Sequence, residues 1–185
     1  TGSSAREHVH RQRHRFSGIM VGAGTVLADD PQLTCRIDGL QNPVRIICDT
    51  NLRIPPEAQV VATAGEVPTI IATCCEDADR CEIYEQKGCR ILHTDKKNGH
   101  VDLKQLMEKL GKLQIDSILL EGGGTLNWAA LQSGIVKKVQ AYVAPKILGG
   151  KTALTPVEGK GVADPADSFI LENSSFEKLG EDLLI

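Results

Sequence analysis

The chain has 185 residues, of which 41% are hydrophobic and 24% are charged. This length suits one domain with a sizeable core, and this composition argues against disorder. The formal net charge of −3 predicts no general affinity for nucleic acid, and no apolar run is long enough to span a membrane. We therefore expect a folded cytoplasmic protein that binds neither nucleic acid nor membranes.

The cysteine pattern indicates free thiols rather than disulfides or a metal site. Two of the cysteines lie in or at the end of apolar, strand-like runs, as expected for thiols in a reducing compartment. There is no CxxC pair, and the spacings match no common zinc site, so we expect no metal. The six cysteines are Cys35, Cys48, Cys74, Cys75, Cys81 and Cys89.

Apolar runs flanked by turn residues alternate along the chain with segments of helical periodicity. The expected strands are 16–21, 43–49, 69–73, 90–93, 116–121 and 138–144. The expected helices are 3–15, a short one ending near 29–31, 102–113 and 125–132. Such alternation predicts an α/β fold, a mostly parallel sheet flanked by helices, formed by residues 1–185 as a single domain.

Three local features complete this description of the fold. Ser4 and Glu7 have the spacing of a capping box at the start of the first helix. Segments 168–171 and 182–185 could pair as a C-terminal hairpin, and the long segment 149–167 is expected to form a surface flap.

The strongest chemical signal is a strand that runs through Glu121 into three glycines and then into a helix. Glycines at such a turn let backbone N–H groups approach an anion closely, and the helix N-terminus adds a favourable dipole. This suits the phosphates of a dinucleotide, although a purely structural tight turn is the alternative. Glu121 lies where open α/β sheets place ligand-contacting residues, unless it is only a solvated loop carboxylate.

A second glycine turn, Gly22-Ala23-Gly24-Thr25, follows the first expected strand and leads into a short helix. The two turns could therefore face one crevice. Asp29 and Asp30 at the end of that helix oppose its dipole, which hints at another use. A simple Asp-Asp-Pro helix stop is the preferred alternative.

Basic residues gather on the first helix, where Arg6, His10 and Arg13 share one face, and Arg36 follows shortly after. Guanidinium groups suit a phosphate because each donates parallel hydrogen bonds. Arg13 and Arg36 are the candidate pair, and a solvated cationic face is the alternative. After the second strand, the hydroxyl and Arg groups of 49–53 would suit a 2′-phosphate, with Asx-type turn capping as the alternative.

In this order, the motifs resemble the reductase domain of the bacterial deaminase–reductases of riboflavin biosynthesis, which has a dihydrofolate reductase-like fold. The matching text includes TVLADDPQLTCR at 25–36, NPVR at 42–45, DTNLRIP at 49–55, LEGGGTL at 120–126 and APKILGG at 144–150. The resemblance covers essentially the whole chain.

The resemblance implies a role for each matching position. It implies NADPH-dependent reduction of 5-amino-6-(5-phosphoribosylamino)uracil to the ribitylamino product. Asp29 or Glu121 would assist proton transfer as the ribose opens. Substrate contacts are implied for Arg13, Leu33, Arg36 and Glu121. NADPH contacts are implied for Thr25, Asp29, Thr50, Gly123, Gly124, Thr125, Leu126, Asn127, Trp128 and Ala129.

The chain also departs from the pattern of that family. The family's domain begins with a strand and a Ser-Leu-Asp-Gly-type loop, and these are absent here, as is the zinc deaminase domain expected in the parent chain. We therefore expect a sheet that lacks its first strand and poor turnover by the chain alone. A homodimer is implied by the resemblance.

Three other functions remain open. The archaeal and fungal type of reductase acts on the diaminopyrimidinone phosphate before deamination. A non-catalytic dimerisation fragment would have no use for Arg13, Arg36, Glu121 or the triple glycine. A dihydrofolate reductase would have no use for the basic helix.

Overall fold

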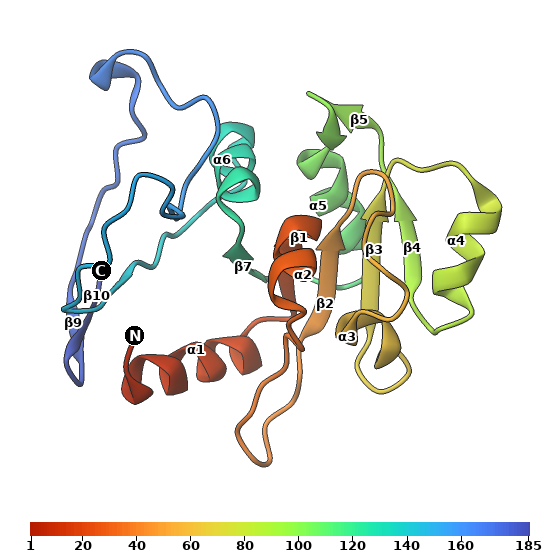
Figure 1. The fold of residues 1–185 in the computed structure, drawn as a ribbon, viewed down its shortest axis with the longest axis horizontal. Coiled ribbons are helices and arrows are strands. Elements are labelled where there is room, and N and C mark those ends of the chain that lie inside the picture. The colour runs from red at the N-terminus through yellow and green to blue at the C-terminus, as the bar shows by residue number, and fades with distance from the viewer.

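A five-stranded parallel sheet forms the centre of the molecule in a computed structural model that describes residues 1–185 (Figure 1). The strand order is β4-β3-β2-β1-β7. Every neighbouring pair in this sheet is parallel, which confirms the expected mostly parallel sheet. The strands are β1 Gly18–Gly22, β2 Val44–Cys48, β3 Thr69–Thr73, β4 Arg90–His93 and β7 Ile118–Gly122.

Helices connect successive strands and cover the sheet (Figure 1). Three of the four expected helices agree with the structure to within two residues, and the short one is α2. The helices α3 and α4 were not expected, because each is short and has a weak apolar pattern. The helices are α1 Ser3–Arg15, α2 Ala23–Asp29, α3 Gln59–Ala62, α4 Ala78–Glu85, α5 Leu103–Lys112 and α6 Gly124–Ser133. None of them has the length and apolar character needed to cross a bilayer.

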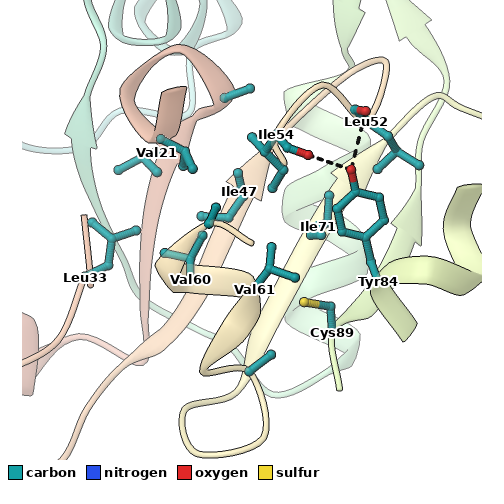
Figure 2. Close-up of a cluster of buried hydrophobic side chains, with 14 of the residues drawn as sticks. Val21, Leu33, Ile47, Leu52, Ile54, Val60, Val61, Ile71, Tyr84 and Cys89 are labelled. Atoms are coloured by element: carbon teal, nitrogen blue, oxygen red, sulfur yellow. Dashed lines mark hydrogen bonds between the residues drawn. The ribbon is translucent and has the colours of Figure 1, made fainter. Parts of the chain in front are cut away.

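The core lies on both faces of this sheet, because alternate residues of each strand point to opposite sides. One face contributes Val21, Ile47 and Ile71 to a cluster that Tyr84 of α4 closes (Figure 2). The Tyr84 hydroxyl donates to the Ile54 carbonyl at 2.6 Å, so its polar end is satisfied inside the core. The other face packs against α5 and α6 through a second cluster. A sheet covered on both faces explains why its strands are continuous apolar runs.

A smaller antiparallel sheet, ordered β8-β10-β9, holds the C-terminal end of the chain. Its strands are β8 Tyr142–Val143, β9 Glu177–Leu179 and β10 Asp182–Leu184. The expected strand 138–144 is therefore much shorter than predicted. The expected hairpin partner 168–171 was wrong: β10 pairs with 177–179 instead, because Gly180, at φ +66°, allows a tight turn directly before it. Two further short strands, β5 Lys96–Lys97 and β6 His100–Val101, pair with each other.

The start of α1 corrects the expected capping box. Gly2 is the N-cap residue, and no side chain caps the helix. Instead, the Gly2 N–H donates to the buried carboxylate of Asp182 at 2.6 Å. Ser4 lies against the Gly180 turn. The carboxylate that stabilises this helix end therefore comes from β10, far away in the sequence, which a local capping pattern does not reveal.

The segment 144–176 contains no strand and only one short 3₁₀ helix, Pro165–Asp167. It runs beside α6 and β10 at one end of the molecule (Figure 1). Most of its side chains are exposed, in agreement with the expected surface flap over 149–167.

Candidate functional site

The carboxyl ends of β1, β2 and β7 lie at one edge of the parallel sheet, where open α/β sheets bind their ligands. The two glycine turns meet there. The Gly123 N–H donates to the Thr25 hydroxyl at 3.2 Å, which joins the start of α6 to α2. The expectation that both turns face a common region therefore agrees with the structure.

Backbone geometry explains the glycines that follow β7. Gly122 has φ +127°, a region that side-chain-bearing residues rarely adopt. Gly123 is the N-cap of α6, and no side chain caps the helix start. The first N–H groups of α6 thus have no capping side chain, which is the arrangement in which helix starts bind anions.

Residues 124–129 divide into two groups on α6. Leu126 and Ala129 pack against the core cluster beneath the helix. Thr125 is exposed, and the Asn127 amide donates to the Pro156 carbonyl at 2.8 Å. Trp128 makes an edge-to-face contact with Phe169, with ring centroids 5.7 Å apart. The side chains of Leu126 and Ala129 therefore support the helix from the core side.

A short strap, residues 156–159, lies over the beginning of α6. The Glu158 N–H donates to the Gly124 carbonyl at 3.1 Å. The side chain of Glu158 packs so closely on Gly124 that a Cβ there would lie 2.5 Å from it. A carboxylate therefore stands beside the helix start that we consider for a phosphate.

Arg13 and Glu121 form a two-bond ion pair. Arg13 Nε donates to Glu121 Oε1 at 2.7 Å, and Nη2 donates to Oε2 at 2.6 Å. The side chains are only 14% and 19% exposed. The remaining Nη1 donates to the Thr34 carbonyl at 2.9 Å. Arg13, from α1, thus fixes the carboxylate at the end of β7.

This pairing changes two expectations about the site. With its donors directed to Glu121 and Thr34, Arg13 is not free to share a phosphate equally with Arg36. The guanidinium also donates to both carboxylate oxygens of Glu121, which suits a hydrogen-bond acceptor held in a fixed position. Glu121 also acts on Tyr142 of β8: burial and the charge of Glu121 raise the pKa of the Tyr142 hydroxyl.

Arg36 lies in an exposed loop whose base is fixed in the core. Leu33 is buried at φ +54°. The buried guanidinium of Arg45 donates to the Gln32 carbonyl at 3.2 Å. Arg36 itself is exposed, so its guanidinium is the free cation of this region. The sequence analysis did not single out Arg45, because a buried arginine has no pattern that distinguishes it from a solvated one in a strand.

His10 is a further residue that the sequence analysis left without a role. Its Nδ1 lies 3.3 Å from the Arg36 backbone nitrogen. Burial and then the charges of Arg13 and Arg36 lower the pKa of His10 below 6.5, against the Thr34 carbonyl and Glu121, which raise it. His10, Arg13, Arg36 and Glu121 thus form one electrostatic cluster.

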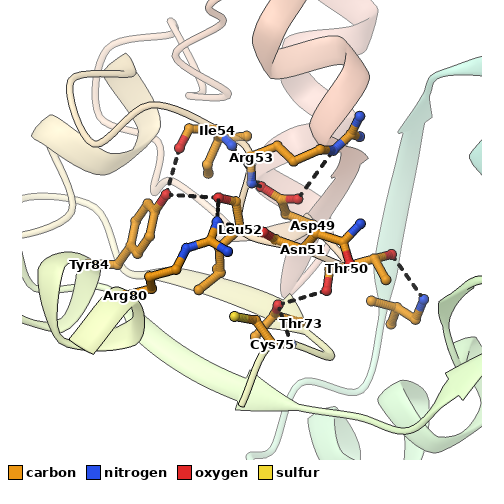
Figure 3. A network of polar contacts seen from close by, with 11 residues as sticks. Asp49, Thr50, Asn51, Leu52, Arg53, Ile54, Thr73, Cys75, Arg80 and Tyr84 are labelled. Atoms are coloured by element: carbon orange, nitrogen blue, oxygen red, sulfur yellow. Dashed lines mark hydrogen bonds and ion pairs between the residues drawn. The ribbon is translucent and has the colours of Figure 1, made fainter. Parts of the chain in front are cut away.

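The turn after β2 is organised by a buried carboxylate (Figure 3). Asp49 Oδ2 accepts from the backbone N–H groups of Arg53 at 2.5 Å and Ile54 at 2.8 Å. Its Oδ1 has no hydrogen-bond partner, and Arg53 Nε lies 3.8 Å away. Thr50 follows directly, and its hydroxyl accepts from the Val101 N–H at 3.3 Å. The Asx-type alternative is therefore present, and it presents Thr50 and Arg53 at the ligand-binding edge.

The two aspartates at the end of α2 differ in what they do. Asp30 adopts the left-handed conformation, and its carboxylate accepts from the Gln59 N–H at 2.8 Å. Asp30 is thus part of the helix stop. Asp29, in the last turn of α2, is exposed. The structure does not bring Asp29 into contact with the Arg13–Glu121 pair.

The chain is similar to proteins of riboflavin biosynthesis along its whole length. The family model described as the RibD C-terminal domain matches residues 1–185. The riboflavin biosynthesis protein RibD of Actinobacillus pleuropneumoniae is 48% identical over the whole chain, which spans 49% of that protein. A 2,5-diamino-6-ribosylamino-4(3H)-pyrimidinone 5′-phosphate reductase of Methanothermobacter thermautotrophicus is 39% identical over the whole chain, which covers 85% of it.

Solved structures show the same relationship. Acinetobacter baumannii RibD matches with a TM-score of 0.83 at 27% identity, covering 100% of this chain and 50% of that one. The riboflavin biosynthesis reductase Rib7 of Saccharomyces cerevisiae matches with a TM-score of 0.76 at 26% identity. The match covers 98% of this chain and 79% of the Rib7 chain.

Proposed function

The chain belongs to the family of RibD C-terminal domains, and on this basis we propose that it reduces a phosphoribosylamino-pyrimidine with NADPH. The substrate is 5-amino-6-(5-phosphoribosylamino)uracil, whose ribose opens and accepts hydride at C1′. The observation that carries the proposal is that Glu121, paired with Arg13, ends the same strand whose glycine turn contacts Thr25. The position proposed for the sugar, at Glu121, thus lies next to the turn proposed for the phosphates, at Gly122–Gly124.

NADPH would lie along the carboxyl edge of the sheet. The glycine turn 122–124 and the start of α6 fit its pyrophosphate, since uncapped N–H groups and the helix dipole favour an anion. Thr50 and Arg53 fit the 2′-phosphate, because a hydroxyl and an exposed guanidinium project from the turn after β2. Bound there, NADPH supplies the hydride.

The protein's own residues would position the substrate. Arg36, exposed on its loop, binds the 5′-phosphate, and Leu33 packs beneath that loop. Glu121 accepts a hydrogen bond from the substrate while Arg13 holds its carboxylate in place. Asp29 or Glu121 would assist, through water, the transfer of a proton to the ring oxygen as the ribose opens. Alignment of the hydride donor with C1′ is then the main catalytic contribution.

The pyrimidine itself distinguishes two related functions. The relative from Methanothermobacter thermautotrophicus is named for a diaminopyrimidinone phosphate, and the chain covers most of that protein. Assays of NADPH oxidation with each pyrimidine separate the two. The proposal expects the uracil to be preferred, whereas a preference for the diaminopyrimidinone would assign the chain to the other type.

The free edge of β7 suggests how the parent protein completes the site. β7 is an edge strand that pairs only with β1, and its residues Ile118–Glu121 are only half-buried. We propose that a strand from the remainder of a longer parent chain, which also carries a zinc deaminase domain, pairs with this edge. Because that strand would lie beside Glu121, the parent protein should turn over faster than residues 1–185 alone.

A homodimer is proposed from the exposed apolar side chains of the C-terminal third. Several are more than three-quarters exposed, which is unusual for apolar residues that lie near one another in the chain. A second copy is the occupant favoured by the proposal, and sedimentation should show twice the monomer mass. The side chains are Ile147, Leu148, Leu154, Ile170 and Phe176.

A further inference from the structure

The inference concerns the loop that carries Arg36 and rests on the proposed function. Residues 34–42, here called the Arg36 loop, contain no helix or strand. The base of this loop is fixed by buried Leu33 and by the Arg45 contact to Gln32. The tip of this loop, residues 36–41, is mostly exposed and has no comparable contact with the core. Something else must set the position of Arg36, since an exposed loop loses order easily.

Two histidines on α1 contact the tip of the Arg36 loop. His10 and His14 are one helical turn apart, so their side chains lie on the same face of the helix. The Arg36 N–H donates to His10 Nδ1 at 3.3 Å, and the Gln41 N–H donates to His14 Nδ1 at 3.1 Å. The same ring nitrogen thus accepts a backbone proton at each end of the tip.

These contacts assign the tautomer of both rings. A ring nitrogen that accepts carries no proton, so the proton of each neutral imidazole lies on Nε2. His14 Nδ1 also lies 3.4 Å from the Gln41 carbonyl oxygen. One nitrogen cannot accept and donate at once, and the shorter contact is the one to the N–H group.

Other contacts of α1 with the Arg36 loop agree with this alignment. Arg13 lies between the two histidines and donates to the Thr34 carbonyl at 2.9 Å. The Cys35 thiol lies 3.3 Å from the His10 carbonyl, and the Cys35 N–H donates to Asn42 Oδ1 at 2.8 Å. The helix that positions Glu121 through Arg13 therefore also holds the loop that carries Arg36.

We propose that His10 and His14 are positioning residues that fix the Arg36 loop on α1, and through it the place where Arg36 meets the phosphate of the substrate. Neither histidine needs to touch the substrate. His10 acts as a neutral acceptor, with Arg13, Arg36 and Glu121 as the charged groups around it. The two acceptors determine where Arg36 lies relative to the Arg13–Glu121 pair.

The test compares two double variants of the 185-residue chain. His10→Ala with His14→Ala removes both acceptors. His10→Asn with His14→Asn keeps an acceptor, because the asparagine oxygen takes a position close to that of Nδ1. His93→Ala, at an exposed histidine of β4, is the matched control for loss of a histidine. All sites are at least partly exposed, so the fold should be retained, as circular dichroism can verify.

The first readout is amide hydrogen exchange of Arg36 and Gln41, measured by NMR. In the alanine pair, these two amide hydrogens should exchange about threefold to tenfold faster than in the unmodified chain, because each amide loses one ordinary hydrogen bond. Amides of β1 and β2 should be unchanged, and the asparagine pair should restore protection. Equal exchange in the alanine pair and the unmodified chain, or equal loss in the asparagine pair, would overturn the proposal.

The second readout separates this inference from the proposed function. Ribose 5-phosphate is titrated into each variant, and NADPH is titrated separately. The alanine pair should bind ribose 5-phosphate about threefold to tenfold more weakly, with NADPH affinity unchanged. Unaltered ribose 5-phosphate affinity despite faster exchange would overturn the link to Arg36. If the unmodified chain binds no ribose 5-phosphate, the proposed function fails, and the link between the histidines and the substrate fails with it.

Discussion

The guanidinium of Arg13 and the carboxylate of Glu121 are joined by two hydrogen bonds, of 2.7 and 2.6 Å, across 108 positions of the chain. The pair connects α1 to the end of β7, and Arg13 reaches the Thr34 carbonyl with its remaining donor. Helix, strand and substrate loop are therefore held by one side chain. Loss of Arg13 should affect stability as well as binding.

Replacing Arg13 with Met should lower the free energy of unfolding by about 2 kcal/mol. This loss is larger than that for an exposed ion pair and smaller than the cost of leaving a fully buried charge unpaired. An intermediate value is expected because both side chains are mostly but not fully buried. Urea unfolding measures the change. In a double-mutant cycle with Glu121→Gln, the two changes should couple strongly, and additive effects would show that the pair contributes nothing of its own.

Replacing Gly122 with Ala should weaken NADPH binding. The φ of +127° at this position strains any residue with a Cβ, so the turn that leads to Gly123 and the start of α6 must shift. Fluorescence titration should show an affinity loss of about fivefold to a hundredfold, since strain of this kind costs about 1 to 3 kcal/mol. Gly111→Ala on α5, where a Cβ meets nothing, is the control and should bind NADPH normally.

Replacing Glu158 with Gln should tighten NADPH binding. Its side chain packs on Gly124, beside the helix start proposed for the pyrophosphate, and a carboxylate there repels phosphates. Removing the charge should improve affinity by about twofold to fivefold at low salt, and less at high salt. Calorimetry at two salt concentrations measures this. An unchanged affinity at low salt would indicate that the strap moves away when NADPH binds.

Replacing Arg53 with Ala should reduce the preference for NADPH over NADH. The exposed guanidinium comes from the same turn as Thr50, lies 3.8 Å from Asp49 Oδ1, and would face a 2′-phosphate, which NADH lacks. Titrating both cofactors should show weaker NADPH binding and unaltered NADH binding. Arg90→Ala, at an exposed arginine of β4, is the control. An equal loss for both cofactors would place the 2′-phosphate elsewhere.

The pH dependence of stability should include a contribution from His10. Folding lowers the pKa of His10 below 6.5, so the unfolded chain takes up the proton first as the pH falls. The contribution is therefore complete above pH 6.5 and is lost as the pH falls through the lowered pKa of the folded state. Urea unfolding measures this contribution at two pH values. From about pH 7.5 to about pH 5, the free energy of unfolding should fall more for the unmodified chain than for the His10→Asn variant. Parallel losses in the two proteins would contradict this.

The sequence predicted the strands of the central sheet well, because each is a short apolar run between turn residues and is covered on both faces. It also predicted which strand ends carry polar groups, such as Glu121 and Thr50. It could not predict partners that come from distant elements. The carboxylate that accepts from Gly2 at the start of α1 comes from Asp182, and the donors of Arg13 go to Glu121 and Thr34.

The weaker parts of the prediction have similar physical causes. The C-terminal hairpin was misplaced because β9, Glu177–Leu179, is short and mostly polar, whereas the apolar segment 168–171 remains outside any sheet. His10 was seen on the basic face of α1, yet its contact with the Arg36 N–H depends on the path of a loop without periodicity. Such loops are determined by tertiary contacts, which a linear pattern does not contain.

The central claim is that one site at the carboxyl edge of the sheet holds NADPH beside a sugar phosphate. A crystal structure with NADP⁺ and ribose 5-phosphate bound together tests this most directly. The account predicts the pyrophosphate at Gly123 and Gly124, the 2′-phosphate near Thr50 and Arg53, and the sugar between Glu121 and Arg36. Ribose 5-phosphate bound away from Arg36, or a cofactor that leaves the 122–124 turn untouched, would contradict it.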